Sequence, residues 1–85
     1  MFKVERNISL FSIDDESLVE EINVDILPLE ALRNIFKPNA DDPQMYLVYD
    51  IGEPEAEQLN RYLNVQFDFT KYTYHLYCYD VSTDD

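Results

Sequence analysis

The amino-acid sequence predicts an α+β domain of two layers, with a mainly antiparallel sheet of about four strands and two helices packed on one face. Three observations support this prediction. Two segments whose residues alternate between two faces, as in strands, flank a short acidic turn. Two segments that begin with proline carry apolar residues at helical spacing. A tyrosine-rich segment with strand-like alternation lies near the C-terminus. A chain of 85 residues forms one domain, which we take as residues 1–85. The expected element order is β-β-α-β-α-β.

A β-hairpin is predicted at the start of the chain. Its first strand is expected over residues 2–13 and its second over residues 18–24, joined by a turn at residues 14–17. The alternating residues that share a face within each strand are Val4, Ile8 and Leu10 in the first and Leu18, Glu20, Ile22 and Val24 in the second.

The first helix is predicted to start at Pro28, because the fixed φ of proline suits the first helical position. Its apolar positions recur at helical spacing and are Leu29, Leu32, Ile35 and Phe36. Pro38 ends the helix, since proline lacks the N–H that would continue it. Residues 37–44 then indicate an exposed acidic loop, and residues 45–50 have the composition of a strand.

The second helix is predicted to start at Pro54. Its apolar stripe is Ala56, Leu59, Tyr62 and Leu63. Asn64 is the expected left-handed cap, because asparagine tolerates positive φ. A brief extended segment is expected over residues 65–69.

The last strand is predicted over residues 72–79. One of its faces carries Tyr72, Tyr74, Leu76 and Cys78, and the other carries Thr73, His75, Tyr77 and Tyr79. With both helices on one side, the opposite sheet face is expected to be open and to carry several tyrosines. Residues 80–85 are expected to form a frayed tail.

Strong negative charge is the most informative property of the composition. Eighteen carboxylates face six lysines and arginines, which gives a formal net charge of −12. Binding to nucleic acid or to an anionic membrane surface is therefore not expected, because both require cationic side chains. The charge favours a basic protein partner that is attracted by long-range electrostatics. Solubility alone is the simpler explanation.

No catalytic or metal-binding set is found in the sequence. The only histidine, His75, has no carboxylate at a matching position of its own strand, and Cys78 is expected on the core face. The acidic runs lack the ligand spacing of a calcium loop, and a zinc site needs more than one histidine and one cysteine. We therefore expect neither cofactor nor metal. A single cysteine, with no secretory signal at the N-terminus, favours a cytoplasmic protein.

Two segments resemble small acidic immunity proteins of bacterial polymorphic toxin systems, including contact-dependent growth inhibition. Residues 11–22 form a strand, an acidic turn and a second strand, and residues 63–79 lead from an aspartate-flanked aromatic segment into a tyrosine-rich strand with a cysteine. The resemblance implies a protein that neutralises a cognate toxin domain in the cytosol. It assigns no role to any single residue, because it rests on a pattern of elements. The partner it implies is a basic, nuclease-type toxin domain bound in a 1:1 complex.

The residues expected to contact the toxin form three acidic groups and one pair of tyrosines. They are Asp14, Asp15 and Glu16 in the hairpin turn, Asp41 and Asp42 in the acidic loop, Asp50, Glu53, Glu55 and Glu57 around the start of the second helix, and Tyr77 and Tyr79 on the open sheet face. The helix dipole alone also explains the third acidic group. Three alternatives stay open: a nucleic-acid mimic that inhibits a defence nuclease, an enzyme that uses His75 with a carboxylate, and an acidic domain with only a structural role.

Overall fold

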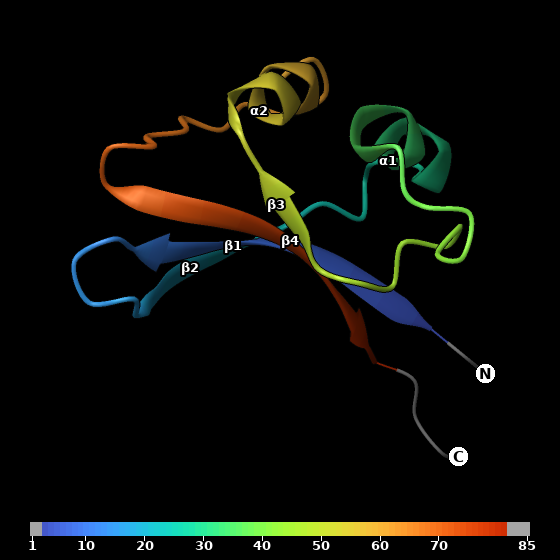
Figure 1. The fold of residues 1–85 in the computed structure, drawn as a ribbon, viewed down its shortest axis with the longest axis horizontal. Coiled ribbons are helices and arrows are strands. Elements are labelled where there is room, and N and C mark those ends of the chain that lie inside the picture. Colours follow the sequence, from blue (N-terminus) through green and yellow to red (C-terminus); the bar gives the residue numbers. More distant parts are fainter. Residues whose placement is uncertain (1–2, 82–85) are drawn as a thin grey trace.

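The sheet of the computed structural model has the strand order β2-β1-β4-β3, and every neighbouring pair of strands is antiparallel (Figure 1). The strands are β1 (Val4–Ser12), β2 (Leu18–Asn23), β3 (Tyr49–Ile51) and β4 (Tyr72–Asp80), and the helices are α1 (Leu29–Phe36) and α2 (Glu53–Leu59). The structure describes residues 3–81. The predicted α+β class and element order are confirmed.

The core lies between the sheet and the two helices, which cover the same side of it (Figure 1). In the two central strands, Ile8 lies opposite Leu76 and Leu10 lies opposite Tyr74, and all four side chains are buried. The helices contribute Leu32 and Leu59, among others, to this layer. Because successive strand residues point to opposite faces, this register also fixes which side chains face away from the helices.

Strand β2 differs from the predicted alternation. The pairing shifts between Leu10 and Phe11, so that Leu10 lies opposite Glu20 while Phe11 lies opposite Leu18. The bulge accommodates Val19 as an extra residue, and Leu18 is therefore not on the face of Ile22 as expected. It lies with Phe11 on the side away from the helices.

Helix α1 forms where proline and the apolar spacing predicted it. Pro28 is the N-cap and not the first helical residue, so the helix starts one residue later than predicted, at Leu29. Lys37 ends the helix in a left-handed conformation with φ 49°. Leu32 and Ile35 are buried. A short amphipathic helix of this kind gains its stability from packing on the sheet.

The strand predicted over residues 45–50 is wrong in its first part. Met45 is 1 % exposed and has φ 55°, a left-handed conformation that a strand does not contain. The chain therefore turns at this residue, and β3 begins only at Tyr49. Its neighbours Leu47 and Val48 are exposed.

Helix α2 is shorter than predicted. It ends at Leu59, with Asn60 as the C-cap at φ −73°, so the predicted left-handed cap at Asn64 is wrong. Tyr62 lies beyond this end and is 56 % exposed, so the predicted membership of Tyr62 in the apolar stripe is also wrong. Ala56 and Leu59 are buried as expected.

The segment before β4 packs by its aromatic rings and is not a strand. Phe67 and Phe69 stack on each other and meet Tyr74 edge-on at centroid distances of 4.8 and 5.2 Å. Strand β4 then runs one residue beyond the prediction, because Asp80 pairs with Val4 and is part of the sheet instead of a frayed tail. The rest of the predicted tail, residues 82–85, and the first two residues of the chain lie outside the described residues.

Candidate functional site

The sheet has one face that no helix covers, which we call the open face (Figure 1). Its side chains are Glu5, Asn7, Ser9 and Phe11 from β1, Leu18, Glu21 and Asn23 from β2, Asp50 from β3, and Thr73, His75, Tyr77 and Tyr79 from β4. The expectation that this face carries Tyr77 and Tyr79 is confirmed. Tyr72 and Tyr74 belong to the opposite, core side.

An aromatic row runs along the open face. Tyr77 and Tyr79 stack with their ring centroids 5.9 Å apart and their planes at 13°. At the other end of the row, Phe11 meets His75 edge-on at 5.6 Å and lies 6.3 Å from Tyr77. The rings hold one another in place, so the row presents a large contact area whose side chains lose little further entropy on binding.

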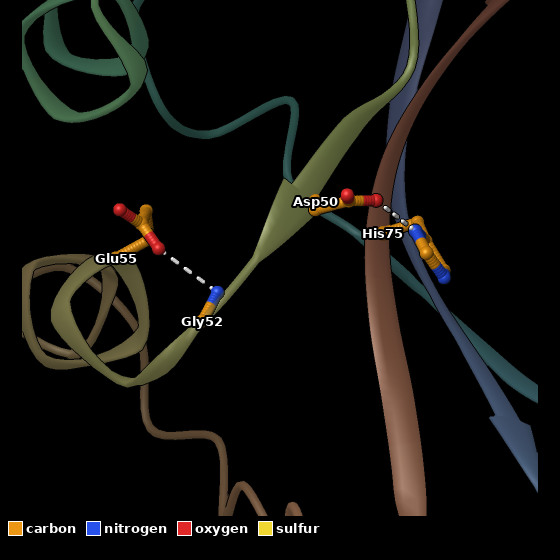
Figure 2. A network of polar contacts seen from close by, with 4 residues as sticks. All are labelled: Asp50, Gly52, Glu55 and His75. Carbon is orange, nitrogen blue, oxygen red and sulfur yellow. Dashed lines mark hydrogen bonds and ion pairs between the residues drawn. The ribbon is translucent and has the colours of Figure 1, made fainter. Parts of the chain in front are cut away.

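His75 has a carboxylate partner that the sequence analysis did not find. Its Nδ1 lies 2.8 Å from Oδ1 of Asp50, and Figure 2 shows the Asp50 side chain reaching from β3 to the ring on β4. The aspartate side chain is 90 % exposed and the histidine side chain 28 % exposed. Asp50 comes from a neighbouring strand, so no inspection of the alternation along β4 could identify it. Asp50 therefore belongs to the open face, and its predicted grouping with the acids at the start of the second helix is wrong.

The serine on the other side of His75 does not complete a catalytic set. Ser9 lies opposite His75 across the β1–β4 pair, which places serine, histidine and aspartate on three adjacent strands. Ser9 is only 1 % exposed, however, and its Oγ has no hydrogen-bond partner among the described residues. A nucleophile must contact its base and be reachable by its substrate, whereas this hydroxyl makes no hydrogen bond to His75 and is shielded from solvent.

Replacing Ser9 by alanine is expected to raise the free energy of unfolding, by up to about 1 kcal/mol, because a buried hydroxyl without a partner keeps its desolvation cost. Thermal unfolding followed by circular dichroism measures this change. The control is Ser17→Ala, which should lower stability, since the Ser17 hydroxyl donates to Asp15 Oδ1 at 2.7 Å. A lower melting temperature for Ser9→Ala would instead show that the hydroxyl stabilises the fold. Loss of the protein's biological activity in this variant would show that the hydroxyl takes part in function.

Carboxylates flank the aromatic row. Glu5 accepts a hydrogen bond from Asn23 (2.9 Å) and Glu21 accepts one from Asn7 (3.4 Å), so both are held against the sheet. Among the strand residues described, the only lysine or arginine is Arg6, and it lies on the core side, where its guanidinium donates to the backbone oxygen of Gln44 at 2.5 Å. The strands therefore give the open face negative charges without a lysine or arginine to neutralise them.

The hairpin turn places Asp14, Asp15 and Glu16 at one end of the sheet, and all three are exposed as expected. Asp15 also holds the turn, because its Oδ1 accepts the hydroxyl and the backbone N–H of Ser17. These hydrogen bonds lower the pKa of the Asp15 carboxyl. Glu16 has φ 60°, and its backbone N–H donates to the backbone oxygen of Ser12 at 2.8 Å. This hydrogen bond fixes the position of the Glu16 backbone, from which the side chain projects.

The acidic loop does not present both of its aspartates to a partner. Asp41 is exposed, but Asp42 is only 6 % exposed, so the prediction that Asp42 lies exposed in the acidic loop is wrong. The Asp42 carboxylate accepts the backbone N–H groups of Tyr46 (2.9 Å) and Leu47 (3.3 Å) and the hydroxyl of Tyr49. These bonds, with the Tyr49 hydroxyl as the largest cause, lower the pKa of Asp42. Asp42 thus fixes the turn that leads into β3.

The acids around α2 have different roles. Glu55 is half-buried and accepts the backbone N–H of Gly52 at 2.9 Å, so it caps the helix, as Figure 2 shows. Glu53 and Glu57 are exposed on the helix layer, across the sheet from the open face. The predicted contact residues therefore separate: Asp50, Tyr77 and Tyr79 share the open face, the hairpin acids lie at its end, and the α2 acids lie on the other side.

Cys78 is a half-buried free cysteine. Cys78 lies opposite Arg6 on the core side, and burial raises the pKa of its thiol, which makes the reactive thiolate scarcer. Within residues 3–81, no three histidine, cysteine, aspartate or glutamate side chains are grouped so that they could hold a metal ion. In the same part of the chain, no helix has the length and apolar character needed to cross a membrane.

Fold and site together define a small, strongly acidic α+β domain whose antiparallel sheet has one helix-free, aromatic face. The chain belongs to the family described as a domain of unknown function, DUF7683, which matches residues 5–77 and so includes both helices and most of the sheet. Comparison with curated proteins and with solved structures gives no match.

Proposed function

We propose that this chain is an immunity protein that binds a cognate bacterial toxin domain through the open face and neutralises it by direct contact. The toxin domain has a basic surface, and the chain itself catalyses no reaction. The observation that carries the proposal is the aromatic row of the open face, flanked by Glu5, Glu21 and Asp50, in a chain with a net charge of −12. A partner that satisfies such a face must supply cations around an apolar centre.

An interface of standard size needs only a small share of the surface of this chain. A standard interface uses roughly 800 Å² of each partner. The whole chain exposes 6010 Å², so such an interface takes about 13 % of its surface. Tyrosines at the centre and charged groups at the rim are the arrangement in which contact residues contribute most to affinity.

Electrostatics explains why an inhibitor of this kind is acidic. A nuclease or another enzyme acting on anionic substrates has a basic cleft, and carboxylates at its rim replace the phosphates that it otherwise binds. Exposed charges mainly increase the rate of encounter, whereas charges desolvated at the centre must be hydrogen-bonded, preferably by arginine. The Asp50 side chain, which is 90 % exposed, is available for such a bond at the cost of its contact with His75.

The proposal is tested by examining the gene next to that of this chain for a toxin domain and, where one is encoded, purifying that domain. We expect co-expression to protect cells and the purified domains to associate at roughly 10⁸ per molar per second at low salt, slowing at least about tenfold by 0.5 M salt while dissociation changes little. Stopped-flow fluorescence measures both rates.

A matched pair of variants locates the interface. Glu5→Gln with Glu21→Gln removes two charges from the open face, and Glu53→Gln with Glu57→Gln removes two from the helix layer. The first pair should slow association more than the second. Association that is indifferent to salt, or more sensitive to the helix-layer pair, would contradict the proposed interface. Tight binding to a restriction nuclease in place of the toxin would favour the nucleic-acid mimic.

A further inference from the structure

A hollow of about 430 Å³ lies on the open face where the hairpin turn meets β4. Its lining includes Phe11, Ile13, Glu16, Thr73, His75 and Tyr77. Its volume falls within the lower range of ligand pockets in proteins. The chemistry of its walls therefore decides what it can bind.

The walls are aromatic on the sheet side and anionic on the turn side. Phe11 and Tyr77 lie 6.3 Å apart and are tilted by 55°, so their rings form an open angle and not a closed stack. Glu16 is the only carboxylate of the lining, and no lysine or arginine belongs to it. The backbone bonds of the turn fix the position from which its side chain projects.

The best match for such walls is a cation with a flat face and an apolar stem. A guanidinium lies on aromatic rings and forms two parallel hydrogen bonds with a carboxylate, while its methylene stem contacts apolar side chains. An ammonium makes a single-point contact and loses more hydration, so lysine fits less well. The negative charge of the chain disfavours an anion, and the carboxylate disfavours a purely apolar side chain.

We propose that this hollow is an arginine-binding subsite, in which the guanidinium of one partner arginine lies against Phe11 and Tyr77 and pairs with Glu16. The inference rests on the proposed function, because it names the group of the basic partner that enters the open face. It also gives the hairpin turn a specific role, which the overall charge alone does not require.

The test uses the full chain with two peptide probes of equal charge, tetra-arginine and tetra-lysine, in an NMR titration of backbone amides. We expect the arginine peptide to shift the amides of Phe11, Glu16, Thr73 and Tyr77 most and to bind at least about threefold more tightly than the lysine peptide. Glu16→Gln should weaken arginine binding roughly threefold or more. Glu57→Gln, which removes the same charge from the helix layer, should change it far less.

Equal affinity for the two peptides, with shifts spread over all acidic surfaces and equal effects of the two variants, would overturn the subsite and leave only general charge attraction. Failure of the subsite and failure of the proposed function give different results. If the chain neutralises its toxin but the peptide does not enter the hollow, the subsite alone is wrong. If the toxin does not bind at all, the interface is wrong, whereas the peptide result still stands on its own.

Discussion

Replacing Tyr77 and Tyr79 together by alanine should weaken binding of the toxin domain by roughly 100-fold or more, while the chain stays folded. The two rings stack on the open face, and Tyr79 is 38 % exposed. Both therefore offer contact area without having to be ordered first, which is the usual basis of a binding hot spot. Isothermal titration calorimetry at moderate salt measures the loss, and circular dichroism checks the fold.

The control for this double variant is Tyr62→Ala. Tyr62 is also an exposed tyrosine, at 56 %, but it follows α2 on the helix layer. Its removal should change affinity less than about twofold, as is normal for residues outside an interface. Because Tyr77 also contacts Phe11 and His75, the milder variant Tyr77→Leu with Tyr79→Leu keeps apolar volume in the row. Unchanged affinity in the alanine double variant would show that the toxin does not bind the open face, and the leucine double variant separates loss of contact area from loss of the tyrosine hydroxyls.

The open face could be predicted from the sequence because it follows from a local rule. Side chains alternate along a strand, so once Tyr74 and Leu76 were assigned to the core, His75 and Tyr77 had to point the other way. The short helices followed from proline and apolar spacing in the same local manner. The facing of the β4 side chains and the burial of Leu32 and Leu59 on the helices, which depend only on neighbours in the chain, were therefore confirmed.

The pairing of His75 with Asp50 could not be predicted in that way. It depends on the register between β3 and β4, which places Asp50 directly opposite His75 although 25 residues separate them. The predicted strand over residues 45–50 also had the wrong bounds, since it included Met45 and omitted Ile51. A strand of only three residues carries too few alternating positions to define its own register.

Asp42 shows a second kind of limit. In the sequence, Asp41 and Asp42 are equivalent members of an acidic loop between two prolines. In the structure, one is exposed and the other turns inward, because the backbone N–H groups of Tyr46 and Leu47 need acceptors where the chain leaves the loop. The neighbouring sequence does not distinguish the two aspartates. The need for an acceptor arises because the fold partly buries the backbone N–H groups of the segment that follows the loop.

Replacing Tyr49 by phenylalanine should lower the melting temperature at pH 7 by roughly 5–10 °C, because the hydroxyl that donates to the buried Asp42 carboxylate is lost. The ring keeps its contact with Phe36 at 5.8 Å, so the change isolates the hydrogen bond. Tyr62→Phe removes a hydroxyl from an exposed ring and is the control, with no expected change. Differential scanning calorimetry of the three proteins measures the effect.

The difference between wild type and Tyr49→Phe should depend on pH at both ends of the scale. The pKa of Asp42 is lowered in the folded state, so the stability its carboxylate contributes is present above its ordinary value of 3.8 and is lost as the pH falls through the folded pKa. Burial is the largest cause that raises the pKa of Tyr49, to about 12, and the hydrogen bond to Asp42 is the second. The stability that the neutral hydroxyl contributes is therefore present below the ordinary tyrosine pKa of 10.0 and is lost as the pH rises from there to about 12. The difference should therefore be largest between pH 5 and pH 9, about the range in which Asp42 is ionised and Tyr49 neutral in both states. A difference that is the same at every pH would mean that the hydroxyl acts through packing alone, and that Asp42 holds the turn before β3 without Tyr49.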